Sequence, residues 1–445
     1  MLQTSQPDSK TDQNRVRRAL RAIAEGDGEL RAFVWHADAD AAPPAATGGP
    51  LAGMPFAVKD VIDVAGMPTR YGAQAMEADC KPFDAASVAL LRQAGAVPVG
   101  KTVTAEFAHV VPGATRNPHL ATHTPGGSSS GSAAAVAAGM ADMALGTQTG
   151  GSVIRPAAFC GVVGYKPTFG RVHRGGMQVL CDTLDTLGWF TRTVDDTIAV
   201  ASVLMSPGTS SGPHVAAPTG SALDTPAGAS LGSLPASRLA GTVRVPKVAV
   251  LPCARLGVLS PAAQLALEQC VQRLQARGAA IVRPDLDADI DTLMDAHATV
   301  MRYEFARGLL PIARTRPQSV HATTRETVRK GLAIGHGDYL QHQHLRAQVA
   351  ARWLGELADV DFIVTPSAPG EAPAGLDNTG SSIYNRIWSL LGWPCIHLPT
   401  ATGELGLPVG VQWVGRPDTD ADLLRWAAAL HASIDTRAST DRPAV

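Results

Sequence analysis

PGGSSSGSAAAVAAG at residues 125–139 and GTQTGGSVIRPAAFCGVVGYKPTFGR at 146–171 are serine- and glycine-rich runs with little charge. Such a composition usually marks a flexible linker. Here the glycines alternate with Ala/Val blocks that can pack in a core, so we expect them to be fixed backbone positions. Glycine lets main-chain N–H groups approach a ligand closely, and a fixed serine hydroxyl can become a nucleophile. These two runs therefore predict a catalytic site.

The bulk composition indicates a soluble enzyme. The chain has 445 residues, a net charge of -1, 17% charged residues and 5% aromatic residues. It can bury a large core, and it has neither the basic surface nor the aromatic platforms of a nucleic-acid or acidic-membrane binder. Residues 1–15 lack the apolar region of a secretory signal, and the most apolar stretch, 133–146, is too short to cross a bilayer. Six scattered cysteines without CxxC spacing indicate buried thiols, so we expect a cytoplasmic location.

Helical and strand-like patterns alternate along the chain, which is typical of an α/β layered fold. Expected helices are a charged one followed by a second short one within 14–33, one at 87–94 and one at 420–432. Expected strands are 55–61, 96–100, 361–366 and 409–414. Residues 206–243 are rich in Pro, Gly, Ser and Ala, and we expect a flexible surface loop between two halves of one domain.

Lys59 is a candidate general base. A serine attacks an amide carbonyl only if a base takes its proton, and a neutral lysine can do so. The free pKa of lysine is about 10.4, but burial can lower it by several units. Lys59 ends the apolar run 56–58, so a buried position is plausible. The alternative is a surface ion pair with Asp60 or Asp63, and the sequence leaves both open.

Two serines are candidate partners of this lysine. Ser128 follows a Gly-Gly pair, which permits unusual backbone geometry, and Ser152 follows Thr-Gly-Gly. With Pro156 close behind it, Ser152 is also typical of a helix N-cap. The same geometry would let the N–H groups of residues 149–152 converge on an oxyanion, where one donor is worth roughly 3–4 kcal/mol. The cap and the nucleophile remain alternatives at this point.

Together these runs resemble the amidase signature family. Also similar to that family are PFAVKD at 55–60, VGKTVTAEFA at 99–108, LDTLGWFTRTVDD at 184–196, GWPCIHLPT at 392–400 and GLPVGVQWVGRPDTDADLL at 406–424. The resemblance covers about residues 50 to 430 and is densest at 51–196. It implies a single-domain α/β/α layered fold with a central mixed sheet. One amidase domain would then span 1–445, with residues 244–435 completing the sheet and the pocket.

The resemblance also implies a Ser–cis-Ser–Lys triad. Lys59 would be the base, Ser152 the nucleophile, and Ser128 the bridging serine, joined to Gly127 by a cis peptide bond. The expected oxyanion donors are the backbone N–H groups of Thr149, Gly150, Gly151 and Ser152. The implied reaction is hydrolysis of a small amide through an acyl-enzyme, with no cofactor and no metal. The implied partners are a small-molecule amide and a second copy of the chain in a homodimer, with no nucleic acid and no membrane.

Three departures from the family pattern concern specificity. Gln148 stands where the family usually has Asp, and Ser130 replaces a glycine. The order Ser152-Val153-Ile154-Arg155-Pro156 stands where the family usually reads Ser-Ile-Arg-x-Pro. The first and third are similar to malonamidase-like members, in which the arginine of this segment faces a substrate carboxylate. We hypothesise that Arg155 binds a polar or carboxylate-bearing acyl group, since guanidinium forks match carboxylates. A structural ion pair of Arg155 is the alternative.

Rival functions attach to the same chain. Residues 95–102 match the P-loop pattern GxxxxGK[ST], yet a helix precedes them, they are strand-like, and Pro98 lacks an N–H for phosphate. Residues 127–131 match the GxSxG nucleophile elbow, but the preceding run at 119–125 is a poor strand. The glutaminase component of a glutamyl-tRNA amidotransferase, its A-type subunit, shares the whole signature and is a closer rival. That role needs partner subunits.

The C-terminal half gives weaker signals. His336, His342 and His344 form a loose cluster, for which solvated helix positions are favoured over a metal site. Five further residues could shape the acyl pocket or belong to core or surface: Tyr303, Glu304, Asn385, Trp388 and Trp393. The physiological substrate stays open.

Overall fold

The computed structural model describes residues 9–38, 48–73, 76, 79–205 and 245–431. The loop expected at 206–243 lies outside these residues. A mixed sheet of eleven strands runs through the described chain in the order β1-β3-β2-β4-β6-β5-β10-β11-β9-β7-β8. Its strands are β1 (Phe33–His36), β2 (Pro55–Lys59), β3 (Val97–Thr102), β4 (Met143–Gln148), β5 (Val163–Lys166), β6 (Thr186–Thr191), β7 (Lys247–Val250), β8 (Ala280–Val282), β9 (Phe362–Pro366), β10 (Cys395–Thr402) and β11 (Pro408–Val414).

Parallel and antiparallel pairs divide the sheet into regions. β2 pairs in parallel with both β3 and β4, and β7 pairs in parallel with β8 and β9. The strands between these two regions are antiparallel, from β4–β6 through β5 and β10 to β11–β9. β2 and β4 are buried along their whole length and lie side by side, so residues at their carboxyl ends are brought together.

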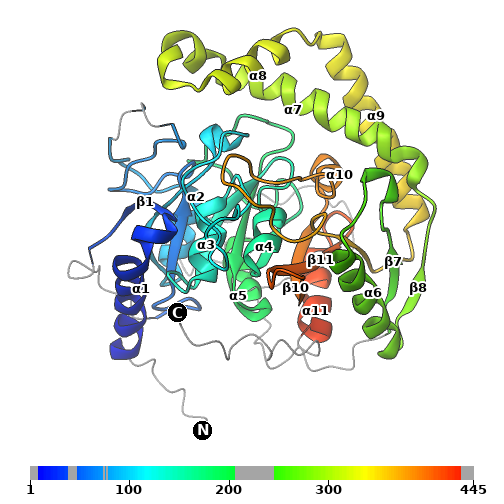
Figure 1. Cartoon of the computed structure of the whole chain (residues 1–445), viewed down its shortest axis with the longest axis horizontal. Coiled ribbons are helices and arrows are strands. Elements are labelled where there is room, and N and C mark those ends of the chain that lie inside the picture. Colours follow the sequence, from blue (N-terminus) through cyan, green and yellow to red (C-terminus); the bar gives the residue numbers. More distant parts are fainter. Residues whose placement is uncertain (1–8, 39–47, 74–75, 77–78, 206–244, 432–445) are drawn as a thin grey trace, which may run out of the picture.

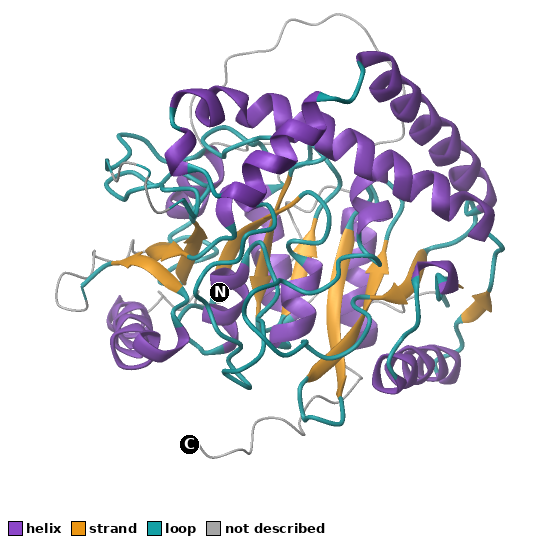
Figure 2. Cartoon of the chain, turned by 45° about the horizontal axis from the view of Figure 1, so that its top comes forward, coloured by secondary structure: helices purple, strands orange, loops and turns teal. Residues whose placement is uncertain are grey.

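Helices cover both faces of the sheet, as Figures 1 and 2 show. They are α1 (Ser9–Leu30), α2 (Ala86–Gln93), α3 (Ser130–Ala137), α4 (Ile154–Cys160), α5 (Val194–Leu204), α6 (Pro261–Ala276), α7 (Asp287–Thr315), α8 (Ala322–Leu332), α9 (His336–Glu356), α10 (Arg386–Leu391) and α11 (Asp420–His431). Short 3-10 turns occur at Glu106–Ala108, Ala254–Leu256 and Pro317–Ser319. The α/β/α layering with a central mixed sheet is therefore confirmed. Within the described ranges, no helix is long and apolar enough to cross a membrane.

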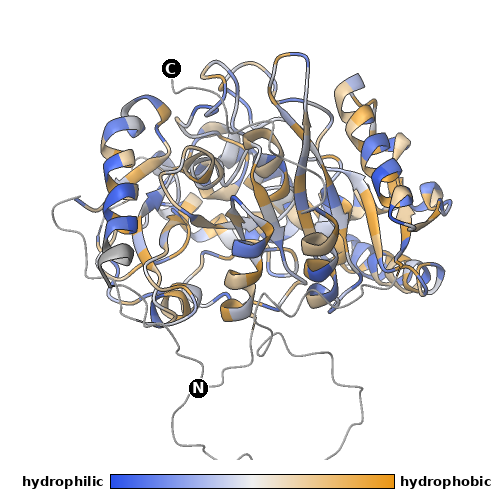
Figure 3. Ribbon diagram, turned by 90° about the horizontal axis from the view of Figure 1, so that it is seen from below, coloured by the Kyte–Doolittle hydropathy of each residue, from blue (hydrophilic) through white to orange (hydrophobic). Residues whose placement is uncertain are grey.

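Successive apolar side chains of the strands point to opposite faces of the sheet, and both faces are covered by helices. Val248 and Phe362 belong to the core cluster that contains α2, α5, α6 and α11, whereas their neighbours Ala249 and Ile363 belong to the cluster under α7, α9 and α10. Successive side chains of a strand point to opposite faces, so a sheet covered twice needs apolar residues at both positions. Figure 3 shows the apolar strands between helices whose outer sides are polar.

The expected strands at 55–61, 96–100, 361–366 and 409–414 are confirmed, as are the helices at 87–94 and 420–432, with shifts of a few residues at their ends. The N-terminal expectation is wrong, because α1 is one continuous helix rather than two. It ends where Arg31 takes a left-handed conformation with φ 56°. The Asp27 carboxylate then accepts the backbone N–H of Ala32 at 2.6 Å, which secures the exit from the helix.

Candidate active site

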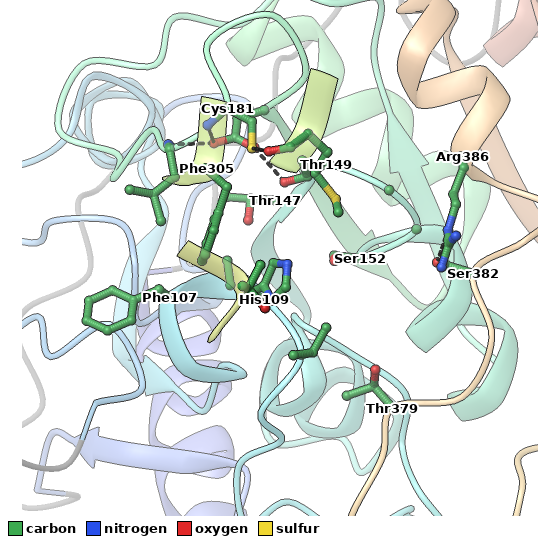
Figure 4. Close-up of a pocket in the computed structure, with 18 of the residues that line it drawn as sticks. Phe107, His109, Thr147, Thr149, Ser152, Cys181, Phe305, Thr379, Ser382 and Arg386 are labelled. Atoms are coloured by element: carbon green, nitrogen blue, oxygen red, sulfur yellow. Dashed lines mark hydrogen bonds between the residues drawn. The ribbon is translucent and has the colours of Figure 1, made fainter. Parts of the chain in front are cut away.

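A cavity of about 490 Å³ opens where β2, β4 and the start of α4 meet α7 and the segment before α10. Its described lining includes Thr147, residues 149–152, Asp185, His297 and Arg386. Figure 4 shows Ser152 in the middle of this lining, with His109 on one side and Ser382 and Arg386 on the other. The nucleophile predicted from the sequence therefore faces a space large enough for a small molecule.

Lys59 is fully buried at the end of β2. Its Nζ donates to Ser128 Oγ at 2.7 Å and to Thr147 Oγ1 at 2.7 Å. Burial lowers the pKa of Lys59 from 10.5 to about 7, because an ammonium loses its hydration there, and the carboxylate of Asp185 only partly offsets this. The alternative of a surface ion pair is wrong: Asp60 pairs with Lys101 at 3.2 Å, and Asp63 is paired with Lys81.

Ser128 is fully buried next to this lysine. The peptide bond between Gly127 and Ser128 is cis, as the resemblance implied. The Ser128 carbonyl accepts the Ala105 N–H at 3.0 Å, and the Gly127 carbonyl accepts two guanidinium N–H groups of Arg155. Because both flanking carbonyls are bound, the Ser128 hydroxyl is held next to Lys59.

Ser152 is not a helix cap. α4 begins at Ile154 with Val153 as its N-cap, and Gln148 supplies the capping oxygen: its Oε1 accepts the N–H groups of Val153 at 2.9 Å and Ile154 at 3.0 Å. Among the described residues, the Ser152 hydroxyl has no hydrogen bond, including none to Ser128, and it lines the cavity. Ser152 thus lies at the cavity, but among the described residues no hydrogen bond joins its hydroxyl to that of Ser128.

The turn before Ser152 carries free N–H donors. The carbonyls of Thr149, Gly150 and Gly151 accept from His297 Nε2 at 3.1 Å, from the Ser389 hydroxyl at 2.7 Å and from a backbone N–H at 2.9 Å. The peptide unit is planar and trans, so each N–H points away from the carbonyl bonded to it. The N–H groups of Gly150, Gly151 and Ser152 have no acceptor within the part of the chain that the structure describes. Such a turn can bind a developing oxyanion.

Asp185 fixes the start of this turn and was missed by the sequence analysis, although it lies in the quoted run at 184–196. Its Oδ1 accepts the Thr149 hydroxyl at 2.5 Å, and its Oδ2 accepts the N–H groups of Leu180 at 2.8 Å and Cys181 at 2.9 Å. Burial raises the pKa of Asp185, while these hydrogen bonds and nearby Lys59 act in the opposite direction. Figure 4 shows Thr149 and Cys181 close together above Ser152.

Arg155 lies in α4 and lines the cavity, as expected for a substrate-binding residue, but all three of its guanidinium nitrogens bind backbone carbonyls. Nε and Nη2 donate to Gly127 O at 3.2 and 2.5 Å, and Nη1 donates to Gly380 O at 2.6 Å. Burial lowers the pKa of Arg155 to about 9. No acid pairs with Arg155 among the described residues, so the alternative of a structural ion pair is not found there.

Two histidines of the cavity wall carried no signal in the sequence. Burial lowers the pKa of both His109 and His297 to about 4, so both imidazoles are neutral near pH 7. His297 donates from Nε2 to the Thr149 carbonyl and thereby orients the turn formed by residues 149–152. His109 stacks on Phe305 at 4.3 Å, and neither of its ring nitrogens has a partner within the described ranges.

The five C-terminal candidates lie behind the wall rather than in the described cavity lining. Trp388 and Trp393 pack against Trp353 in the core. The Glu304 carboxylate accepts hydrogen bonds from the hydroxyls of Thr183 and Tyr339, and Tyr303 stacks on Tyr339. The Asn385 amide donates to the Ser367 carbonyl.

The three histidines of α9 have separate partners: His336 contacts the Tyr303 hydroxyl, His342 the Asp338 carbonyl, and His344 the Gln348 amide.

The two motif-based rivals are wrong. Residues 97–102 form the buried strand β3, in which Lys101 is an ion-pair partner, so no phosphate loop exists there. Residues 127–131 lead into α3 without a preceding strand at 119–125. The middle serine, Ser129, is fully buried, and its hydroxyl donates to the Thr147 carbonyl at 3.2 Å instead of facing the cavity.

Comparison with known proteins agrees with this geometry. The Amidase family model matches residues 28–424. The A-type subunit of glutamyl-tRNA(Gln) amidotransferase from Akkermansia muciniphila is 34% identical over 443 residues, covering 90% of this chain and 91% of the relative. The structure of the corresponding Thermotoga maritima protein superposes with a TM-score of 0.77 at 28% identity, covering 94% of this chain and 91% of that one. A 6-aminohexanoate cyclic dimer hydrolase gives 0.80 at 25% identity, with 95% and 94% coverage.

The family model matches most of the chain, and a relative is 34% identical to it. Residues from both serine- and glycine-rich runs lie at or beside the same cavity. The chain belongs to the amidase signature family and is an enzyme that acts on the carbon–nitrogen bonds of amides.

Proposed function

We propose that this protein hydrolyses a small amide through an acyl-enzyme on Ser152. The observation that carries the proposal is the buried amine of Lys59, which is bonded to the hydroxyls of Ser128 and Thr147 and lacks an ion-pair partner among the described residues. With its pKa lowered to about 7, a large fraction of this amine is neutral near pH 7. A neutral amine in this place can accept a proton.

In the first half-reaction, Ser152 Oγ attacks the amide carbonyl carbon. Ser128 receives the proton of Ser152 and gives its own to Lys59 Nζ. The carbonyl oxygen becomes an oxyanion that accepts hydrogen bonds from the N–H groups of Gly150, Gly151 and Ser152. The Lys59 ammonium returns its proton through Ser128 to the nitrogen of the substrate, the C–N bond breaks, and ammonia or an amine leaves.

In the second half-reaction, water attacks the ester carbonyl of the acyl-enzyme. Its proton follows the same route to Lys59 and returns to Ser152 Oγ when the acid is released. The step between Ser128 and Lys59 follows the hydrogen bond of 2.7 Å between them, and Ser152 lines the cavity where the amide would bind. Closure of the Ser128–Ser152 gap is expected when substrate fills the cavity, since catalytic hydrogen bonds often tighten only then.

Ammonia release from small amides tests this proposal. Ser152→Ala is expected to abolish turnover, with a loss of about 10³-fold or more. Ser129→Ala is the matched control, because Ser129 is a buried serine of the same segment whose hydroxyl binds the Thr147 backbone. Full turnover by Ser152→Ala, or equal losses in the two variants, would contradict the assignment.

A second candidate is the glutaminase component of a glutamyl-tRNA amidotransferase, and the names of the curated relatives favour it. The chemistry at Ser152 would be the same, with glutamine as the amide and ammonia passed to a partner. Ammonia release from glutamine by the purified chain, measured alone and with added partner subunits of such an enzyme, separates the two. Activity that needs the partners supports the amidotransferase role, and full activity without them supports a stand-alone hydrolase.

In the sequence, Gln148 and Arg155 are the residues that favour a polar or carboxylate-bearing acyl group and a likeness to malonamidases. Arg155 lines the cavity while supporting Gly127. If Arg155 binds the acyl group, Arg155→Ala lowers kcat/KM for malonamate more than for a neutral amide. An equal loss for both substrates would assign it a supporting role alone.

A further inference from the structure

We infer that Arg386 binds a carboxylate of the substrate, and that the preferred substrate is a monoamide of a dicarboxylic acid without an ammonium group. This inference rests on the proposed amide hydrolysis, because Ser152 defines where the amide carbonyl lies. It concerns the far side of the cavity, which the sequence analysis left unassigned.

Arg386 is a half-buried guanidinium with unused donors. It is the first residue of α10, it lines the cavity, and its Nε donates to the Ser382 hydroxyl at 3.2 Å. For both Nη atoms, the described residues provide neither a hydrogen bond nor a carboxylate at ion-pair distance. Figure 4 shows Arg386 above Ser382, on the side of Ser152 opposite His109. Two parallel N–H groups of this kind match the two oxygens of a carboxylate.

The neighbourhood of Arg386 is positively charged. Four basic residues line the cavity: Arg155, Arg302, Lys330 and Arg386. Burial and, after it, the charge of Arg302 lower the pKa of Arg386. Partly buried cations that repel one another destabilise the empty site, and an anionic ligand removes that cost. Lys330 already pairs with Glu326 at 3.6 Å, and Arg302 is exposed on α7, so Arg386 is the best placed of the four to contact a small ligand.

Arg155 is a weaker candidate for this contact. Its three guanidinium nitrogens all donate to the backbone carbonyls of Gly127 and Gly380. A carboxylate on Arg155 would have to share those donors, whereas Arg386 offers both Nη groups without losing a bond. The two arginines therefore divide the work: Arg155 supports the segment before Ser128, and Arg386 receives the ligand.

The described cavity lining offers no free carboxylate to a substrate ammonium, which disfavours substrates that carry one. Asp185 is the one acidic residue among the described residues that line the cavity. Both of its oxygens are occupied by Thr149, Leu180 and Cys181. The α-ammonium of an amino-acid amide such as glutamine would therefore meet several cations and, among the lining residues that the structure describes, no free carboxylate. Glutaramate has the same carboxylate and amide as glutamine and lacks that ammonium.

The test compares matched amides. kcat/KM is measured for malonamate, succinamate and glutaramate, each beside the amide in which an isopropyl group replaces the carboxylate, and for glutamine beside glutaramate. At least one anionic amide is expected to exceed its neutral partner about tenfold or more, as a charge-assisted hydrogen bond allows, and glutaramate is expected to exceed glutamine. Arg386→Met should lower kcat/KM for the anionic amides about tenfold more than for their neutral partners, and Arg386→Lys should keep part of the advantage of the anion.

Arg425→Met is the control for loss of a guanidinium, because Arg425 is partly exposed on α11 and pairs with Asp422 away from the cavity. Equal kcat/KM for each anionic amide and its neutral partner, a preference for glutamine, or an equal loss for both classes in Arg386→Met would overturn the inference.

Binding separates this inference from the proposed function. Glutarate, succinate and malonate are titrated calorimetrically into Ser152→Ala with and without Arg386→Met, and at least one dianion is expected to bind and to lose about tenfold or more in affinity with the second change. Binding that depends on Arg386 without any amide turnover by the wild type would contradict the proposed function and support the anion site. Turnover of amides without any binding of a dianion would support the proposed function and contradict the anion site.

Discussion

The Lys101 ammonium lies 3.2 Å from the Asp60 carboxylate, and both groups are fully buried. Asp60 is the chain neighbour of Lys59, and it would be the nearest counter-ion for that lysine by sequence. Because Lys101 takes it, the Lys59 amine is left with the hydroxyls of Ser128 and Thr147. The charge of Lys101 on β3 is thus balanced by Asp60, and Lys59 on β2 remains available as a base.

Lys101→Met is therefore expected to destabilise the protein strongly. Removing one partner of a buried ion pair leaves an uncompensated charge and typically costs about 3–5 kcal/mol. The free energy of unfolding from urea titration measures the loss. Lys81→Met is the matched control, because the Lys81–Asp63 pair is 3.8 Å long and partly exposed, and it should cost less than about 1 kcal/mol. Equal losses would contradict the assigned role of Lys101.

The pH profile follows from the lowered pKa of Lys59, whose main cause is burial. Only the neutral amine accepts a proton, so kcat/KM should fall as the pH decreases through about 7. Asp185→Asn removes a negative charge that raises the pKa of Lys59, and the fall should then begin at lower pH. Rate profiles of the wild type and this variant measure both effects. A profile that stays flat down to pH 5 would contradict a lysine base.

The same shift affects stability. The folded pKa of Lys59 is depressed below that of the unfolded chain, so the unfolded state binds more protons between pH 7 and 10.5. The cost of burying Lys59 is therefore full below pH 7 and disappears as the pH rises toward 10.5. The free energy of unfolding of the wild type should rise with pH in that window relative to Lys59→Met. Parallel curves for the two proteins would show that Lys59 titrates normally.

Gln148→Leu tests whether Gln148 supports the turn formed by residues 149–152, the proposed oxyanion site. The change leaves the N–H groups of Val153 and Ile154 without their acceptor and removes the donor to Ser389, which holds the Gly150 carbonyl. Unpaired buried groups cost about 1–3 kcal/mol each, and kcat should fall because the donors move. Gln148→Glu keeps the acceptor oxygen and should retain more stability in thermal unfolding. Unchanged kcat in Gln148→Leu would show that this contact does not position the turn.

Much of the site could be predicted from local sequence, because the family runs carry Lys59, Ser128 and Ser152 with their glycines. The short strands were equally visible, since buried strands are continuous apolar runs between glycines and prolines. What sequence reasoning missed depends on contacts between distant segments. The bond from His297 to Thr149 and the position of Arg386 arise only when α7 and α10 pack over the sheet. The continuity of α1 was missed because its glycines resemble a break, whereas the helix continues to Leu30, just before the left-handed Arg31.

Reaction with a sulfonyl fluoride, followed by intact-mass measurement and peptide mapping, tests the central claim most directly. The proposed mechanism predicts one sulfonyl group on Ser152, formed far more slowly in Lys59→Ala because the serine then lacks its base. Labelling of Ser129 or Cys181 instead, or an equal rate of labelling in Lys59→Ala, would contradict it.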